Sequence, residues 1–357
     1  MIRVRAMRED RGRFAAEHDS RALVYWPHGL GDWATLSVIA PLFDPSNAYA
    51  IARFGDDYTS LMEGDRIFRP LRSGVDKPTD GSFLGTRNLG LEIKRCDGRE
   101  LELNLPHTLE AEVAAFAPDV LLWTDYPETE GRTPYPFHTK ARNLAGLLVR
   151  RERLSEFDLS QPLRSTLDFV APQETQAKLD AQLATFAPPG TKLGIISRTG
   201  FTAVRKNWGD GSEARAFVQT MGEDGWRFVS MDDEPLGENV AGFRALFAEL
   251  DEPFARLYKA LAARAALFAG VPAGPLHVTM ARLGIPTVGL WLAHHPDWYD
   301  EPNPDAIHLV GRSVRDKGFD KRPATVTKPP SLQHRIVYLD SLDIPANAVV
   351  EAVRQAS

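Results

Sequence analysis

Short runs of apolar residues recur along this chain, each bounded by turn residues, and this pattern predicts buried strands. Segments with helical spacing follow the runs, so that strand, helix and strand fit within about 30 residues, the repeating unit of a parallel sheet. The pattern occurs before residue 125 and again after residue 192, which predicts two doubly wound α/β halves. The expected strands are Ala22–Trp26, Tyr49–Phe54, Val120–Trp123, Leu193–Ser197, Trp226–Ser230, Ala266–Phe268 and Thr287–Trp291.

A stretch without periodicity separates the two halves. Residues 156–172 contain two prolines and follow a segment with helical spacing, His138–Leu154, so we expect a linker there. We predict a Rossmann-like domain over residues 1–165 with a glycine-rich, hairpin-rich insertion at about 70–107, a second Rossmann-like domain over 173–330, and a tail with a last helix over 331–357. The other expected helices are Trp33–Phe43, Gln173–Phe186 and Ile344–Ala356.

Composition narrows the class of protein. The 357 residues carry 42 Lys and Arg against 48 Asp and Glu, and a net charge of −6 gives no global basic field for nucleic acid. The single Cys96 excludes a disulfide framework and a multi-cysteine metal centre. The first twenty residues lack the apolar core of a signal peptide, and no run approaches the ~18 apolar residues of a spanning helix. We therefore expect a soluble, cytoplasmic protein with at most peripheral membrane contact.

A glycine turn follows the first expected strand. Gly29, Gly31 and Ala34 fit the G-x-G-x-x-A pattern of dinucleotide-binding folds. Asp32 argues against that interpretation, because a carboxylate at the helix start repels a pyrophosphate. Two interpretations of Asp32 remain open: it caps the helix Trp33–Phe43, or it removes a proton from a hydroxyl as a general base.

Two later segments are typical of phosphate binding. Gly274 and Pro275 open a helix directly after a strand, and a helix N-terminus presents free N–H groups to an anion. The loop after Ser197 carries cations at Arg198, Arg205 and Lys206. Each segment also has a plain structural interpretation, an ordinary helix start and a solvated basic loop.

Taken together, these motifs resemble the heptosyltransferases, which are ADP-heptose:lipopolysaccharide glycosyltransferases of family GT9. The resemblance rests on the turn Pro27–Asp32, the loop Lys206–Trp208 and the stretch Gly274–His277 followed by Leu283–Val288, and it spans roughly residues 22–295. It implies a GT-B fold, in which two Rossmann-like, doubly wound parallel-sheet domains face a cleft. The first domain would bind the acceptor and the second the nucleotide-sugar.

The resemblance also implies roles for individual residues. Asp32 is the expected general base, and Asp232 or Glu234 is expected to hold the ribose of the donor. The family has an Asp just before the small-Gly-Pro element, where this chain has Pro272. The residues expected around the donor phosphates are Ser197, Arg198, Arg205, Lys206, Gly274, Pro275 and His277, and those expected on the acceptor side are His28, Gly29 and Gly31.

The expected function is that of an inverting, metal-independent glycosyltransferase. It moves a sugar from an NDP-sugar, ADP-heptose by resemblance, to a hydroxyl of a glycan or glycolipid and needs no cofactor. No Asp-x-Asp triplet occurs in the chain, and we expect no metal at His294 and His295. The alternatives are a non-catalytic nucleotide-sugar-binding protein, favoured by Pro272, and an NAD-dependent oxidoreductase that uses the first glycine turn. The sequence leaves the sugar, nucleotide, acceptor and oligomeric state open.

Overall fold

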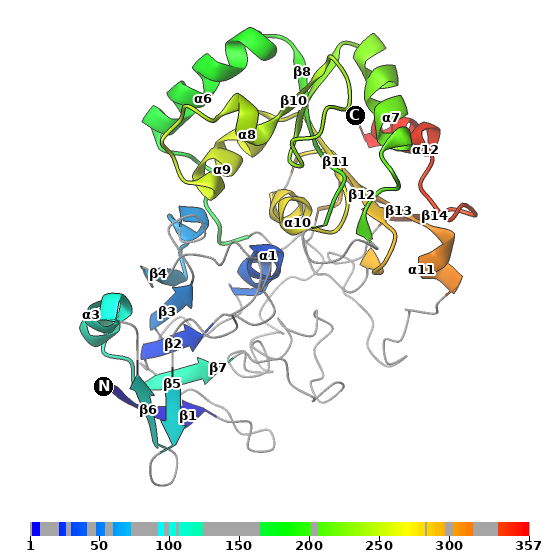
Figure 1. The fold of residues 1–357 in the computed structure, drawn as a ribbon. Coiled ribbons are helices and arrows are strands. Elements are labelled where there is room, and N and C mark those ends of the chain that lie inside the picture. The colour runs from blue at the N-terminus through cyan, green and yellow to red at the C-terminus, as the bar shows by residue number, and fades with distance from the viewer. Residues whose placement is uncertain are drawn as a thin grey trace. The chain divides into compact units, whose positions relative to one another are not determined.

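A computed structural model describes the following parts of the chain. These are residues 2–7, 21–25, 30–40, 48–53, 60–72, 92–95, 100–104, 107–123, 165–200, 206–282, 284–296, 303–316 and 335–356. The chain divides into two compact units (Figure 1). The first consists of residues 1–158, 165–168 and 253–255, and the second of residues 159–164, 169–252 and 256–357.

In the first unit, the described residues form a seven-stranded sheet of order β4-β3-β2-β7-β1-β6-β5. Five neighbouring strands run parallel to one another, namely β4, β3, β2, β7 and β1. Strand β6 is antiparallel to both β1 and β5. The sheet is therefore a doubly wound core extended by an antiparallel edge. Its strands are β1 Ile2–Met7, β2 Arg21–Tyr25, β3 Ala48–Arg53, β4 Phe68–Arg72, β5 Glu92–Arg95, β6 Glu100–Asn104 and β7 Val120–Trp123, and its helices are α1 Leu30–Ile39, the 3-10 helix η2 Ser60–Met62 and α3 His107–Phe116.

In the second unit, the described residues form a sheet of seven parallel strands in the order β10-β9-β8-β11-β12-β13-β14. The strands are β8 Lys192–Ser197, β9 Trp226–Ser230, β10 Val240–Gly242, β11 Leu267–Gly270, β12 Thr287–Trp291, β13 Ala306–Val310 and β14 Arg335–Tyr338. The helices are α6 Gln173–Phe186, α7 Ser212–Glu223, α8 Phe243–Leu246, α9 Phe254–Arg264, α10 Gly274–Ala281, α11 Arg312–Asp316 and α12 Ala346–Ala356.

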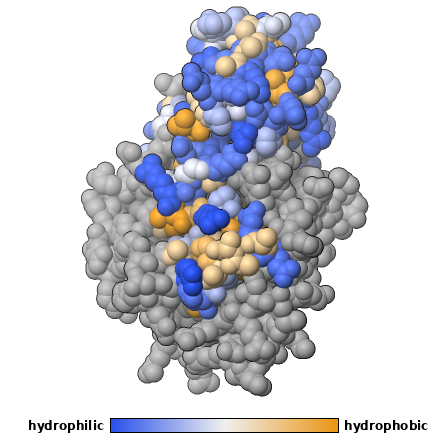
Figure 2. All heavy atoms as spheres, turned by 90° about the vertical axis from the view of Figure 1, so that its left-hand side faces the viewer, coloured by the Kyte–Doolittle hydropathy of each residue, from blue (hydrophilic) through white to orange (hydrophobic). Residues whose placement is uncertain are grey.

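Helices cover both faces of the second sheet. Figure 1 shows α7 and α12 on one side and α6, α8 and α9 on the other. Helix α7 buries Ala214, Phe217, Val218 and Met221, the three- and four-residue spacing of a helix with one apolar face. Helix α6 likewise buries Thr175, Leu179 and Leu183, and Figure 2 shows a mostly hydrophilic surface on the side of the second unit that carries this helix. The apolar face of each helix thus points toward the sheet, and the two helices pack on opposite faces of it.

Most of the expected strands and helices are confirmed. The bounds of β7, β9, β12 and α6 are those expected from the sequence, and β2, β3, β8, β11 and α12 are shifted by one or two residues. The strands β1, β4, β10, β13 and β14 were not predicted, whereas the antiparallel pair β5 and β6 lies within the hairpin-rich insertion expected at about 70–107. In β1, charged residues alternate with apolar ones, as in a strand with one buried face, and an alternation over so few residues is a weak signal in the sequence. The expected helix His138–Leu154 lies outside the described residues.

None of the helices in the described part of the chain is long and apolar enough to span a membrane.

Candidate functional site

The second sheet reverses its winding between β8 and β11, which lie side by side although more than sixty residues separate them. In open α/β sheets, ligands bind beyond the carboxyl ends of the strands at such a point. Ser197 and Gly270, the last residues of the two strands, are paired, and the N–H of Val271 donates to the carbonyl of Ser197 at 2.9 Å. A Cβ on Gly270 would lie 2.7 Å from that carbonyl oxygen, so this approach requires glycine.

Helix α10 starts at this edge of the sheet. Ala273, the residue before it, is extended with φ −132° and ψ 173°, and Pro275 follows in the first turn, where its fixed φ suits a helix start. No side chain caps this N-terminus, and its first turn contains no acidic residue. The first-turn amides and the helix dipole therefore favour an anion here, although Pro275 itself has no N–H to donate.

The basic loop after β8 lies against the same helix start. Lys206 Nζ donates to the carbonyl of Pro272 at 3.4 Å, two residues before α10. Trp208 fixes the loop, because its backbone N–H donates to the carbonyl of Arg198 at 2.9 Å and its Nε1 to the carbonyl of Ile344 at 2.7 Å. The indole is fully buried. Lys206 and the α10 start, expected from separate motifs, are thus brought together.

Arg198 and Glu234 were expected to contact phosphate and ribose, and in the structure they contact each other. The Arg198 side chain is 10% exposed, and its Nε donates to Glu234 Oε2 at 2.7 Å. A second guanidinium nitrogen donates to Glu234 Oε1, and the third to the carbonyl of Gly209 at 3.0 Å. This bidentate pair ties the end of β8 to the segment after β9.

Asp232 also binds the loop that follows β8. Its carboxylate accepts the backbone N–H groups of Arg198 and Thr199 and the hydroxyl of Thr199. Burial raises the pKa of Asp232 above its ordinary value, and these hydrogen bonds oppose the rise. The carboxylate therefore shapes the loop on which the candidate phosphate ligands stand.

His277 faces the interior of the second unit. The residue is 4% exposed, and its ring lies edge-on to the indole of Trp291, with 6.3 Å between the ring centroids. Trp291 Nε1 in turn donates to His308 Nδ1 at 2.8 Å. Trp291 and His308 were not expected at this position, because both occur in apolar strands and no local pattern distinguishes a hydrogen-bonded aromatic pair from core residues.

In the first unit, α1 follows the carboxyl end of β2, beside the reversal between β2 and β7. The backbone places Asp32 third in α1, since the helix begins at Leu30. The interpretation of Asp32 as the cap of a helix starting at Trp33 is therefore wrong. Gly31 is buried within the same first turn. His28 and Gly29, like Arg205 of the basic loop, lie outside the described residues.

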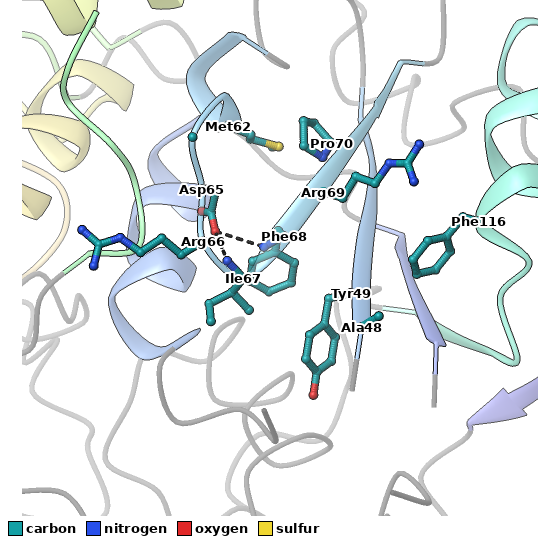
Figure 3. Close-up of a pocket in the computed structure, with 11 residues that line it drawn as sticks. Ala48, Tyr49, Met62, Asp65, Arg66, Ile67, Phe68, Arg69, Pro70 and Phe116 are labelled. Atoms are coloured by element: carbon teal, nitrogen blue, oxygen red, sulfur yellow. Dashed lines mark hydrogen bonds between the residues drawn. The ribbon is translucent and has the colours of Figure 1, made fainter. Parts of the chain in front are cut away.

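A pocket of about 540 Å³ lies in the first unit, away from this helix start (Figure 3). Its lining includes the first residues of β3 and β4 and the last residue of α3, so it opens at the amino ends of the parallel strands. Asp65 has a structural role, because its carboxylate accepts hydrogen bonds from the N–H groups of Ile67 and Phe68 at 2.9 and 3.0 Å. In Figure 3 the side chains of Arg66 and Arg69 point to opposite sides and form no common anion site.

Across the described residues, no group of three or more His, Cys, Asp and Glu side chains is arranged to hold a metal ion.

Comparison with models of known protein families finds no match, and comparison with curated protein sequences finds none either. Comparison with solved structures does find matches. A glycosyl transferase of family 9 from Veillonella parvula is 14% identical, with a TM-score of 0.56 over 96% of this chain and 98% of that one. The fold resembles that of a family 9 glycosyltransferase. The ADP-heptose lipopolysaccharide heptosyltransferase II of E. coli is 13% identical, with a TM-score of 0.49 over 94% and 98% of the two chains.

The GT-B class expected from the motifs is thereby confirmed as the fold of this chain. At 14% identity the match shows the fold alone, so the chemistry has to be argued from the residues at the α10 start and in the basic loop.

Proposed function

We propose that this chain is a glycosyltransferase that moves a sugar from a nucleoside-diphosphate donor to a hydroxyl acceptor with inversion at the anomeric carbon. One observation carries the proposal: Lys206 and the uncapped start of α10 meet at the reversal point of the second sheet. The GT-B fold supports it, because the ordinary ligand position of such a sheet is this same edge.

On the donor side, negative charge grows on the β-phosphate as the bond to the sugar stretches. The first-turn amides of α10 at Gly274 and Leu276 and the ammonium of Lys206 would stabilise that charge. Ser197, at the end of β8, would line the same site, while Arg198 and Asp232 hold its loop in shape. His277 and Pro275 would act by fixing the helix, the first through Trp291 and the second through its φ.

On the acceptor side, we propose Asp32 as the general base. Its carboxylate would take the proton of the acceptor hydroxyl while the acceptor oxygen forms a bond to the anomeric carbon. The bond from that carbon to the β-phosphate oxygen breaks on the opposite side, and its electron pair leaves with the nucleoside diphosphate. ADP-heptose is the first donor to test, because the motifs at Pro27–Asp32 and Gly274–His277 resemble those of the heptosyltransferases.

A non-catalytic nucleotide-sugar-binding protein is the second candidate. Pro272 stands where the resembling family has Asp, and its carbonyl accepts the hydrogen bond from Lys206. A donor site without that carboxylate still binds diphosphate through amides and a cation. This candidate therefore predicts binding of NDP-sugars without transfer or hydrolysis.

The test is a panel of ADP-, GDP-, UDP- and dTDP-sugars, screened by thermal shift and then for release of nucleoside diphosphate. A ligand at 100 times its dissociation constant raises the free energy of unfolding by ~2.7 kcal/mol, which is easily detected. Replacing Asp32 by Ala should lower turnover by roughly 10²–10⁴-fold and leave the affinity for the nucleoside diphosphate unchanged. Turnover that survives this change would remove Asp32 from the role of base.

The matched variant on the donor side is Lys206→Gln, which removes the charge and shortens the side chain by one atom. We expect it to weaken nucleoside-diphosphate affinity about tenfold, the effect of one charge-assisted hydrogen bond. Binding by the wild type without any turnover across the panel would favour the non-catalytic candidate.

A further inference from the structure

The hydroxyl of Tyr258 reaches from α9 to the first turn of α10. Tyr258 Oη donates to the carbonyl of Pro275 at 2.8 Å and lies 2.5 Å from Thr279 Oγ1. Tyr258 and Thr279 are both fully buried. Figure 1 shows α9 beside α10, the helix whose start the proposed function assigns to the donor phosphates. No local pattern in the sequence indicates this contact.

The hydroxyls of Tyr258 and Thr279 and the carbonyl of Pro275 can share their protons in one consistent way. The carbonyl of Pro275 only accepts, so it takes the proton of the Tyr258 hydroxyl, and the hydroxyl of Thr279 then donates to the Tyr258 oxygen. Thr279 lies one turn after Pro275 and therefore on the same face of α10. Burial raises the pKa of Tyr258 far above its ordinary value, so its hydroxyl remains a donor at any working pH.

The start of α10 is consequently held at two carbonyls by donors from two different elements. Lys206 Nζ donates to Pro272 on the side of the basic loop, and Tyr258 donates to Pro275 on the side of α9. The amides of Ala273 and Gly274 lie between these points. A displacement of this short segment would change the direction of the first-turn amides, to which binding of an anion is sensitive.

We propose that Tyr258 is a positioning residue for the diphosphate site: it fixes the first turn of α10 so that the amides there meet the donor phosphates. The role rests on the proposed function and deepens it, since it concerns the same site. A second tie joins α9 and α10 at the other end, where Arg282 donates to the carbonyls of Ala262 and Ala263. Because only the Tyr258 tie contacts the first turn of α10, variants of the two ties distinguish an effect on the site from an effect on stability alone.

The experiment compares Tyr258→Phe with two matched variants, Thr279→Val and Arg282→Gln. The first removes the bond to Pro275, the second removes the neighbouring hydroxyl and leaves that bond, and the third removes the distal tie. All three should lower the melting temperature. Only Tyr258→Phe should raise the dissociation constant of the nucleoside diphosphate that the wild type binds, by about fivefold, the value of one ordinary hydrogen bond.

The readouts distinguish the outcomes. If the three variants lose stability but bind the nucleotide equally well, Tyr258 is structural only and the inference is overturned. If the wild type binds none of the nucleoside diphosphates, the proposed function fails and the positioning role with it. Amide hydrogen exchange on the wild type needs no variant: nucleotide should slow exchange in α10 and in the α9 peptide around Tyr258, and slowing confined to α10 contradicts the tie.

Discussion

At the scale of the residue, Glu252 ties α6 to α9. Its carboxylate accepts from Arg256 at 2.9 Å and from Lys178 at 3.3 Å, and the side chain is 8% exposed. Burial alone would raise the pKa of Glu252, but hydrogen bonds from Arg256, Lys178 and Thr175 outweigh it and lower the pKa below the ordinary value. A carboxylate with a depressed folded-state pKa stabilises the fold above its unfolded pKa, about 4.3, and the gain is lost as the pH falls through the folded value.

We therefore expect Glu252→Gln to destabilise the protein more at pH 7 than at pH 3. Urea unfolding at a series of pH values measures the difference. Glu174→Gln is the control, because Glu174 pairs with the same Lys178 at 2.8 Å but is 79% exposed, and such pairs contribute little. A loss of stability in Glu252→Gln that stays constant from pH 7 to pH 3 would contradict this account of the tie.

Residue types and spacing identified the basic loop and the α10 start, because both are local patterns after a strand. They did not identify which side chains meet. Arg198 and Glu234 are 36 residues apart, and Tyr258 and Pro275 are 17 apart. Such contacts depend on how neighbouring strands and helices pack, which no local window records. Two residues expected on the ligand thus stand in an ion pair that shapes the site.

At the scale of the element, the approach of β8 to β11 controls the candidate site. Gly270→Ala would place a Cβ 2.7 Å from the carbonyl oxygen of Ser197, a backbone atom that cannot turn away. We expect it to lower the free energy of unfolding by about 1–3 kcal/mol, as overpacking does, and to weaken nucleoside-diphosphate binding as well. Denaturant unfolding and calorimetry measure the two effects.

The matched control is Gly311→Ala, in the same unit. A Cβ there meets a flexible Leu292 methyl at 3.3 Å and two backbone oxygens at 3.4 Å and 3.7 Å. We expect little loss of stability and wild-type nucleotide affinity. Equal behaviour of the two alanine variants would show that the close approach of β8 and β11 does not matter.

Strands buried on both faces were predictable, because their apolar runs are bounded by turns, as in β9 and β12. Strand β1 pairs in parallel with β7 and antiparallel with β6, and its alternation of charged and apolar residues is a weaker signal over so few residues. Strand β13 is also buried along its whole length, but His308 interrupts its apolar run. These two strands were therefore missed because charged or polar residues interrupt their apolar runs.

At the scale of the whole molecule, the chain consists of two α/β units, each with a reversal point and a helix start beside it. The proposal assigns the donor diphosphate to the second unit and the general base to the first. The helix start of the second unit has Lys206 next to it and no acid in its first turn, whereas Asp32 stands in the first turn of α1. An anion is therefore expected to prefer the second unit.

The most direct measurement is a crystal structure of the protein with a nucleoside diphosphate. We predict that oxygens of the β-phosphate lie about 2.7–3.2 Å from the backbone nitrogen of Gly274 and from Lys206 Nζ. A diphosphate seated instead at the glycine turn before α1, or in the pocket between β3, β4 and α3 of the first unit, would contradict the account.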